Sequence, residues 1–328
     1  MSPQVQIRDG IEIHLDSGER VVADADAPDG DMNILSHAHG DHLYSEAPER
    51  ILCSDLTAAL AAQRRTDCPT PKRVSSPRVD LLESGHIPGS RAALIKDEGA
   101  RILYTGDIST RDRFYLSGFE PVDADILIIE STYGTSDYEL PPQDEEEAAF
   151  VSCLNETMGT PILAFGYTLG RAQELQLLGA RSDRETIYVT DAIERINEVI
   201  ESHFETTFDV ESYTRDTILG PKDMVVLPSQ TNQLSFVDGI IEETGAIKVG
   251  VSGWAVESSF KYRGDFDHTF ALSDHCGFTE LIDVVEAVDP ETVYTNHGFT
   301  DELATEITSR LGIHAQSLKR NQSTLGDF

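Results

Sequence analysis

Residues 36–42, SHAHGDH, constrain the fold more than any other segment, because they place three histidines and one aspartate within six consecutive positions. They follow the apolar residues 32–35, which we expect to form a buried strand. A turn at a strand end spreads side chains in several directions, whereas a helix would align them. Imidazole and carboxylate groups suit a borderline cation such as Zn²⁺. The segment therefore predicts a metal-dependent hydrolase, and the alternative is a polar loop that is rich in histidine by chance.

The length and composition indicate a globular protein. A chain of 328 residues with 39% hydrophobic residues can form one large domain or two ordinary ones. No apolar run approaches the length of a membrane span, and the first residues lack the pattern of a secretion signal. The four cysteines, Cys53, Cys68, Cys153 and Cys276, form no CxxC pair. We therefore expect reduced thiols and a cytoplasmic protein.

The charge is strongly acidic, with 58 Asp and Glu against 25 Lys and Arg, six of them lysine, and a net charge of −33. An acidic surface repels nucleic acid at ordinary salt. The acidity is spread along the whole chain, however, and with so few lysines it resembles the proteins of salt-accumulating halophiles. At molar salt the Debye length falls to ~3 Å, so this repulsion nearly disappears. A polyanionic substrate is therefore not excluded, but its binding cannot depend on a basic patch.

The first part of the chain is rich in expected strands. Residues 11–24 have the pattern of a hairpin, and residues 54–65 that of a helix with Ser54 as its N-cap. Residues 91–97 and 101–107 are expected strands around a short turn. Residues 124–130, ADILIIE, have an apolar core, ILII, and predict a strand buried on both faces.

From about residue 139 the pattern changes to strands that alternate with helices, which indicates βαβ units and a parallel sheet. Two late expected strands, residues 268–275 and 291–297, end in histidines, so the last segment should return to the first domain. We therefore expect an α/β protein with a discontinuous domain, residues 1–137 and 266–328, and a second domain, residues 138–265, inserted into it.

Five further candidates for a metal or acid–base site stand at strand ends or in loops: His86, Asp107, Glu130, His275 and His297. Taken alone, a histidine is more often an ordinary polar group, and an aspartate after a strand is usually a turn former. Their occurrence together, in this order, favours one site.

These motifs resemble those of a known family. HAHGDH, GHIPGS and TGD match, in order, the metal motifs of the metallo-β-lactamase fold. ESTYG, LSDH and NHG are similar to three additional motifs of its β-CASP nuclease branch, and FGYTLGRAQEL is similar to a segment near the start of the β-CASP insert. The resemblance covers nearly the whole chain. It is strongest to short members, the archaeal mRNA 3′-end-processing-factor-like proteins and the ligase-associated DNA exonucleases. It implies an αββα sandwich with an inserted α/β β-CASP domain.

The resemblance also implies a set of metal ligands for two Zn²⁺ ions, with Mn²⁺ as the alternative ion. The first ion would be bound by His37, His39 and His86, the second by Asp41, His42 and His297, and Asp107 would bridge both. Two such ions activate water and hold a scissile phosphate, so Asp41 and Asp107 count among the catalytic residues.

The remaining roles follow from the same resemblance. His275 would be the general acid that protonates the leaving oxygen, and Glu130 would accept a hydrogen bond from its ring. Asp24 would orient a metal ligand from outside the ligand set, with Asp16 and Asp26 as the open alternatives.

Gly170 and Arg171 open an expected helix directly after a strand. Its N-terminus, together with one arginine, could hold a substrate phosphate, and an ordinary helix start is the equal alternative.

The sequence therefore favours a dizinc nuclease that hydrolyses RNA in RNA processing and binds single strands. The alternative is a DNA exonuclease that acts with a ligase. A non-catalytic scaffold and a small-ester hydrolase are two further hypotheses that the sequence favours less. Because no appended RNA-binding domain is recognisable, affinity could come from a homodimer or a partner protein.

Overall fold

The computed structural model describes residues 3–319, which form two compact units. The first unit comprises Met1–Asp112, Leu116–Asp137 and His275–Phe328, and the second comprises Arg113–Tyr115 and Tyr138–Asp274. No helix among residues 3–319 is long and apolar enough to cross a membrane.

The first unit contains two large sheets. The four-stranded sheet has the order β1-β2-β3-β4, with β1 (Gln4–Ile7), β2 (Ile11–His14), β3 (Arg20–Ala23) and β4 (Met32–Ile34). The six-stranded sheet has the order β18-β17-β10-β9-β8-β7, with β18 (His314–Ser317), β17 (Thr292–Gly298), β10 (Ile126–Ser131), β9 (Ala100–Tyr104), β8 (Arg91–Asp97) and β7 (Val79–Glu83). The short strands β5 (Arg50–Ile51) and β6 (Lys72–Arg73) pair separately.

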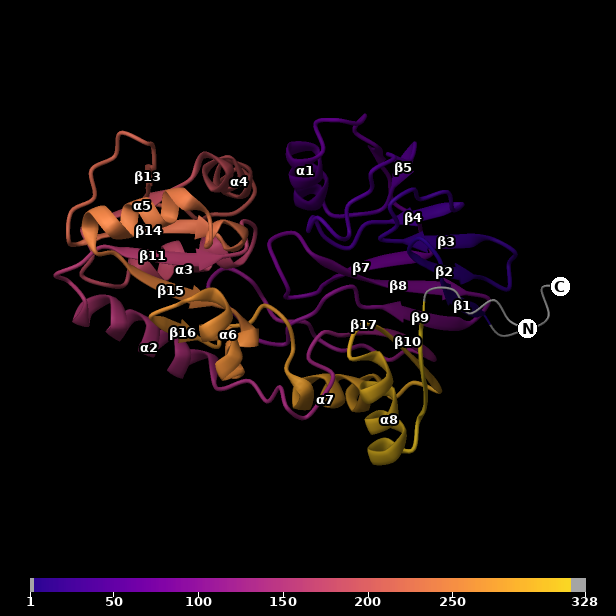
Figure 1. Ribbon diagram of the computed structural model, residues 1–328. Coiled ribbons are helices and arrows are strands. Elements are labelled where there is room, and N and C mark those ends of the chain that lie inside the picture. Colours follow the sequence, from indigo (N-terminus) through magenta and orange to yellow (C-terminus); the bar gives the residue numbers. More distant parts are fainter. Residues whose placement is uncertain (1–2, 320–328) are drawn as a thin grey trace. The chain divides into compact units, whose positions relative to one another are not determined.

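The two large sheets of the first unit share a hydrophobic core. Ile13 of β2 and Val21 of β3 pack in one cluster with Ile95 of β8 and Tyr104 of β9. The opposite face of the six-stranded sheet packs against α7 (Phe278–Val288) and α8 (Thr300–Leu311), as Figure 1 shows. The order of layers is therefore sheet, sheet, helices.

The local sequence accounts for several of these elements. β10 is one of the two central strands of the six-stranded sheet, and its apolar side chains are almost entirely buried. The helix α1 (Asp55–Arg64) begins after Ser54, whose side chain accepts a hydrogen bond from the Thr57 amide, as the sequence predicts. The strands β2 and β3 form the expected antiparallel hairpin.

The second unit is built on a six-stranded sheet in which all pairs are parallel. Its order is β13-β12-β14-β11-β15-β16, with β13 (Glu211–Ser212), β12 (Thr186–Val189), β14 (Asp223–Pro228), β11 (Ile162–Gly166), β15 (Ile247–Val251) and β16 (His268–Phe270). One face carries α2 (Gln143–Glu156), α3 (Arg171–Gly179) and α4 (Asp191–Glu201). The other carries α5 (Ser235–Thr244) and α6 (Ser258–Gly264). A parallel sheet that is covered on both faces explains the long apolar strands of this part.

Three expectations about the elements differ from the structure. The second unit extends to Asp274 and not to residue 265, because β16 pairs with β15 in its sheet. β16 ends at Phe270, so His275 lies in a loop before α7 and not at a strand end. Asp107 likewise lies in the loop after β9, which ends at Tyr104.

Candidate metal centre

The histidine run lies in the loop that follows β4, at the edge of the first unit's sheets. The ring centroid of His37 is 4.0 Å from that of His42, 4.9 Å from that of His39 and 4.7 Å from that of His86. His37 and His86 are fully buried, and 2% of His42 is exposed. This loop, together with His86 from the loop after β7, therefore gathers four imidazoles into one largely buried cluster.

Asp107 lies at the centre of this cluster. Its Oδ2 atom is 3.5 Å from His37 Nε2, 3.5 Å from His42 Nε2 and 3.6 Å from His86 Nε2. The ligand atoms of His37, His39, His86 and Asp107 all lie within 4.8 Å of one another. Nitrogens from three imidazoles therefore surround one carboxylate oxygen.

The His37 ring provides a test of whether these residues fit a metal ion. Its Nδ1 atom lies 2.9 Å from Ser36 Oγ, while its buried Nε2 atom has no hydrogen-bond partner among the described residues. A buried nitrogen without a partner is costly, so it requires an occupant for the space that it faces. Because three imidazoles and a carboxylate are a normal zinc donor set, the residues fit such an ion.

The second expected ligand set is less compact. The rings of His42 and His297 are stacked with centroids 5.0 Å apart. His297 is exposed and has a positive φ of 55°, which an L-residue adopts only where surrounding structure requires it. Asp41 is exposed and joins none of the groups of adjacent ligand atoms found in the described residues. Its role as a ligand therefore stays a prediction.

Asp24 holds His42 from outside the cluster. Asp24 Oδ2 lies 3.0 Å from His42 Nδ1 and accepts hydrogen bonds from Ser36 Oγ at 2.5 Å and Tyr104 Oη at 2.7 Å. The Ser36 amide donates to Asp24 Oδ1 at 2.7 Å. Since Asp24 occupies Nδ1 of His42, the other ring nitrogen is directed at Asp107.

The two competing aspartates make different contacts. The Asp26 side chain accepts a hydrogen bond from the Ser45 amide, and the Asp16 amide donates to Asp97. Of the three candidates, Asp24 is the one that contacts an imidazole of the cluster. Ser36 and Tyr104 complete this network, and neither is predicted as a site residue from the sequence. Their signals are weak, because Ser36 only precedes the histidine run and Tyr104 is one aromatic residue in an apolar strand.

His275 and Glu130 form a hydrogen-bonded pair beside the cluster. The His275 Nδ1 atom is 2.9 Å from Glu130 Oε1 and 3.0 Å from Oε2. Glu130 is fully buried and also accepts hydrogen bonds from the amides of Ile108 at 2.8 Å and Thr132 at 3.3 Å. The His275 side chain is 18% exposed, and its ring centroid is 4.5 Å from that of His86. The His275 ring therefore lies beside both the Glu130 carboxylate and the imidazole cluster.

A register shift places Glu130 in this position. β10 pairs with β17 in parallel, and the pairing is irregular between Glu130 and Ser131. Ser131 Oγ donates to the carbonyl of Asn296 at 3.1 Å and to that of His297. The bulge therefore joins the strand end that carries Glu130 to the strand end that carries His297.

The charges of these groups depend on burial and on one another. Burial lowers the pKa of His37 well below its ordinary value, and the neighbouring imidazoles act in the same direction. Burial also disfavours charge on His42, but Asp107 and Asp24 raise its pKa to about 10. Burial by itself would raise the pKa of Glu130, yet His275 and the two backbone amides hold it below its usual range. His37 is therefore a neutral imidazole, and Glu130 is a carboxylate.

The contacts of Gly170 and Arg171 favour the alternative of an ordinary helix start over a phosphate site. The Arg171 side chain is 2% exposed, forms an ion pair with Glu174 and lies 3.7 Å from Asp274. The Gly170 amide donates to the Gln173 side chain at 2.8 Å. Since the guanidinium is buried against carboxylates and the helix caps its own N-terminus, neither group is directed at a substrate.

The chain has homologues among nucleic-acid enzymes. It is 31% identical over 309 residues to a protein of Opitutus terrae named "Probable DNA ligase", a match that takes in 90% of this chain and 29% of that protein. It is 40% identical over 105 residues to "Cleavage and polyadenylation specificity factor subunit 3" of Dictyostelium discoideum, which is 31% of this chain and 13% of that protein. It is 33% identical over 152 residues to "Endoribonuclease YSH1" of Yarrowia lipolytica, which is 45% of this chain and 17% of that protein. The chain thus spans less than a third of the length of these relatives.

The fold also occurs among solved structures. One example is the crystal structure of a protein of unknown function from Enterococcus faecalis V583, with a TM-score of 0.63, 14% identity and coverage of 97% of both chains. No protein-family model matches the chain.

Proposed function

We propose that the protein is a nuclease of the β-CASP branch of the metallo-β-lactamase fold, which hydrolyses phosphodiester bonds of RNA in RNA processing. The first unit would be the metallo-β-lactamase domain and the second the β-CASP domain. The observation that carries this proposal is the arrangement of three imidazole nitrogens around one oxygen of Asp107, at 3.5 to 3.6 Å. The similarity to an endoribonuclease and a cleavage factor supports RNA as the substrate.

The cluster would hold two zinc ions. His37, His39 and His86 would bind the first, Asp41, His42 and His297 the second, and Asp107 both. When bound, such ions lower the pKa of water and neutralise charge on a phosphate. That neutralisation matters here, because a chain with a net charge of −33 offers the phosphate little other positive charge.

The chain's own acid would be His275. Glu130 would accept a hydrogen bond from Nδ1, so the ring keeps one orientation. A proton on Nε2 can then pass to the oxygen that leaves when the phosphodiester bond breaks. Because Glu130 is buried and receives two backbone hydrogen bonds, it holds this arrangement rigidly.

A second candidate is a DNA exonuclease that acts with a ligase. It is favoured by the match to the "Probable DNA ligase", which extends over 90% of this chain, whereas the two RNA-related matches take in less than half of it. No described contact recognises a 2′-hydroxyl, which is the group that distinguishes the two substrates.

The test compares RNA and DNA single strands of the same base sequence, each labelled at the 5′ or the 3′ end, at several salt concentrations. We expect zinc-dependent cleavage of RNA, and the position of the label in the products shows direction and exo or endo action. Cleavage of DNA alone would replace the first proposal with the second. If neither strand is cleaved by protein that holds zinc, both are contradicted.

A further inference from the structure

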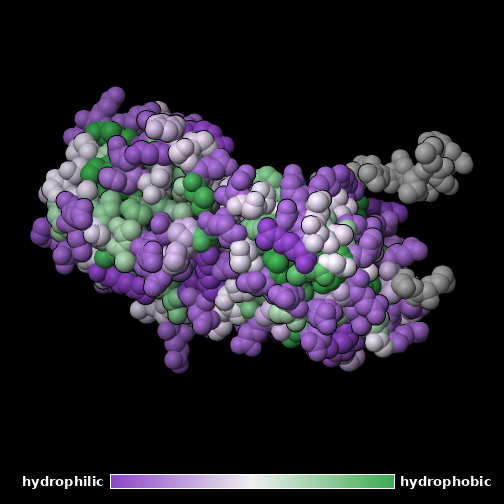
Figure 2. Space-filling view, turned by 90° about the horizontal axis from the view of Figure 1, so that it is seen from below, coloured by the Kyte–Doolittle hydropathy of each residue, from purple (hydrophilic) through white to green (hydrophobic). Residues whose placement is uncertain are grey.

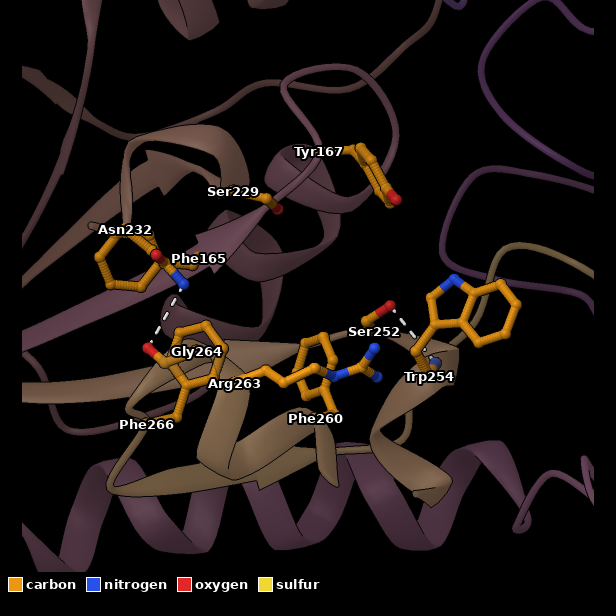
Figure 3. A pocket seen from close by; sticks show the side chains of 10 residues that line it. All are labelled: Phe165, Tyr167, Ser229, Asn232, Ser252, Trp254, Phe260, Arg263, Gly264 and Phe266. Atoms are coloured by element: carbon orange, nitrogen blue, oxygen red, sulfur yellow. Dashed lines mark hydrogen bonds between the residues drawn. The ribbon is translucent and has the colours of Figure 1, made fainter. Parts of the chain in front are cut away.

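The second unit contains an aromatic pocket that the proposed chemistry does not use. Its cavity has a volume of about 520 Å³, within the usual range for small-ligand sites. It opens at the carboxyl ends of β11, β14 and β15 (Figure 3). Its lining consists of Phe165, Tyr167, Ser229, Asn232, Ser252, Trp254, Phe260, Arg263, Gly264 and Phe266. In open α/β sheets this end of the strands is where ligands bind.

One wall of this aromatic pocket is a packed group of phenylalanines. The Phe266 ring stacks on Phe260 with centroids 5.4 Å apart and lies 5.8 Å from Phe165. A Cβ atom at Gly264 would lie 2.0 Å from the Phe266 ring, so glycine is required there. This wall is therefore preformed by core packing, and it does not depend on a ligand for its shape.

The other side of the pocket presents rings to solvent. Tyr167 is 51% exposed, and Trp254 is half-buried. The Trp254 ring packs edge-on against Tyr138, with centroids 5.1 Å apart. Figure 3 shows Tyr167 and Trp254 on the right of the lining and Phe165 and Phe266 on the left, with Arg263 extending between them. The exposed Tyr167 and the half-buried Trp254 thus line the pocket together with a preformed apolar wall.

The polar groups of the pocket indicate the chemistry of its occupant. The Asn232 amide nitrogen donates to the Gly264 carbonyl at 3.4 Å, which leaves the Asn232 oxygen to accept a further hydrogen bond. Arg263 is the charged member of the lining, its side chain is 68% exposed, and Glu257 is 3.9 Å away. These groups suit a ligand that joins a flat heterocycle to an anionic group. The heterocycle would stack on the aromatic rings, its polar edge would bind the amide, and the anionic group would bind the guanidinium.

The negative charge of the molecule favours a ligand that binds by stacking, such as a nucleic-acid base, over a ligand that binds through its negative charge alone. Most proteins hold single strands with a basic groove and with aromatic rings on which bases stack. This chain has 25 basic against 58 acidic residues, and the face in Figure 2 is largely hydrophilic with small hydrophobic patches. Because backbone attraction is weak for such a protein, stacking must supply more of the binding energy.

We propose that the aromatic pocket binds one base of a single-stranded nucleic acid, between Tyr167 and Trp254 on one side and the phenylalanine wall on the other. Arg263 would contact the phosphate of the same nucleotide, and Asn232 the edge of the base. This inference rests on the proposed nuclease function, because it gives the substrate strand a second point of attachment.

The chain provides its own reporter, because Trp254 is its one tryptophan. The experiment titrates the full-length protein with adenosine 5′-monophosphate, which has no phosphodiester bond to cleave, and follows tryptophan fluorescence. Ribose 5-phosphate, which has the phosphate and no base, is the matched ligand control. Tyr262→Ala is the matched protein control, since Tyr262 is an 81% exposed residue of α6 outside the lining.

We expect saturable quenching by adenosine 5′-monophosphate and none by ribose 5-phosphate. Loss of one stacking ring in Tyr167→Ala should raise the Kd about tenfold or more, whereas Tyr262→Ala should leave it unchanged. The absence of quenching, or equal affinity for both ligands, or an equal Kd in both variants, overturns the proposal.

A second measurement separates this proposal from the nuclease function. Bis(p-nitrophenyl) phosphate is a small phosphodiester that needs no base-binding pocket. If the wild-type protein hydrolyses it and adenosine 5′-monophosphate causes no quenching, the pocket proposal fails and the nuclease function stands. If quenching occurs and the zinc-loaded protein hydrolyses no phosphodiester, the pocket binds a base and the nuclease function fails.

Discussion

Asp24 and Asp107 are the two carboxylates that organise the histidines of the candidate site. Asp107 faces the ring nitrogens of three histidines, and Asp24 fixes the orientation of one of these rings through Nδ1. Asp24 is itself held by Ser36 and Tyr104, so the His42 ring has one orientation before any ion binds. This preorganisation should increase the affinity of the site for a metal ion.

Replacing Asp24 with Asn should weaken zinc binding without removing a ligand. Partners that orient a ligand from outside the set typically contribute 10- to 100-fold to metal affinity. We expect a loss of roughly this size in competition with a fluorescent chelator. Asp26→Asn is the control, because Asp26 accepts hydrogen bonds from Ser45 and from the Glu46 amide, which lie outside the ligand set. An equal loss of zinc affinity in both variants would mean that the substitutions disturb the fold, and would contradict a specific role of Asp24 in orienting His42.

Replacing His275 with Ala should separate its role as an acid from a structural one. Loss of a general acid typically costs 10²- to 10⁴-fold in rate, so cleavage of RNA should fall by about that factor. Hydrolysis of bis(p-nitrophenyl) phosphate should fall far less, because nitrophenolate leaves without a proton. Glu130→Gln should show the same selectivity in weaker form. A uniform loss on both substrates would contradict the assignment.

Among the elements, those with a strong local pattern could be predicted from the sequence. The apolar run of β10 and the Ser54 N-cap of α1 are local features, and both have the expected structure. Features that depend on tertiary pairing could not be predicted. The sequence of β16 does not indicate which strand it pairs with, so its pairing with β15 could not be predicted. Arg171 at a helix start resembles a phosphate ligand until the carboxylates around it are known.

The same limit applies to the candidate site. The candidate ligands and their order along the chain could be predicted from the sequence, because several histidines and aspartates at expected turns are typical of a metal site. The Asp24 network was not readable in full, because Tyr104 reaches Asp24 across 80 positions of sequence. The partner of Arg113 was equally hidden. It is Glu174 of α3, at 2.5 Å, and both side chains are almost completely buried.

The ion pair between Arg113 and Glu174 should stabilise the second unit. Residues Arg113–Tyr115 belong to that unit although the chain around them belongs to the first. Removing one partner of a buried pair typically costs 3–5 kcal/mol. For Arg113→Met we expect a loss of about 3 kcal/mol in the free energy of unfolding, the lower end of that range, because Arg171 still neutralises Glu174. Arg195→Met, which removes an exposed pair with Asp191, should cost less than about 1 kcal/mol. Similar losses in urea unfolding of both variants would contradict this account.

For the whole molecule, the net charge of −33 determines how salt acts on substrate binding. A protein that binds through many phosphate contacts loses about 10³- to 10⁵-fold in affinity between 50 and 200 mM salt. Here salt screens repulsion instead, because the Debye length shortens from about 10 Å at 0.1 M to about 3 Å at 1 M.

The affinity for a single strand should therefore stay level or rise with salt. The measurement is fluorescence anisotropy of a labelled ten-nucleotide RNA with the His275→Ala variant, which would leave the strand intact, between 0.1 and 1 M KCl. A steep fall in affinity over this range would mean that a basic surface binds the backbone, contrary to the role assigned to the aromatic pocket and the metal centre.

The central claim is that the side chains around Asp107 hold two metal ions, and native mass spectrometry of the purified full-length chain tests it most directly. After incubation with zinc and removal of the excess, we predict a mass that corresponds to two zinc ions per chain. The Asp107→Ala variant should lose zinc, and Asp26→Ala should retain both ions. A folded wild-type chain that carries no zinc would contradict the account.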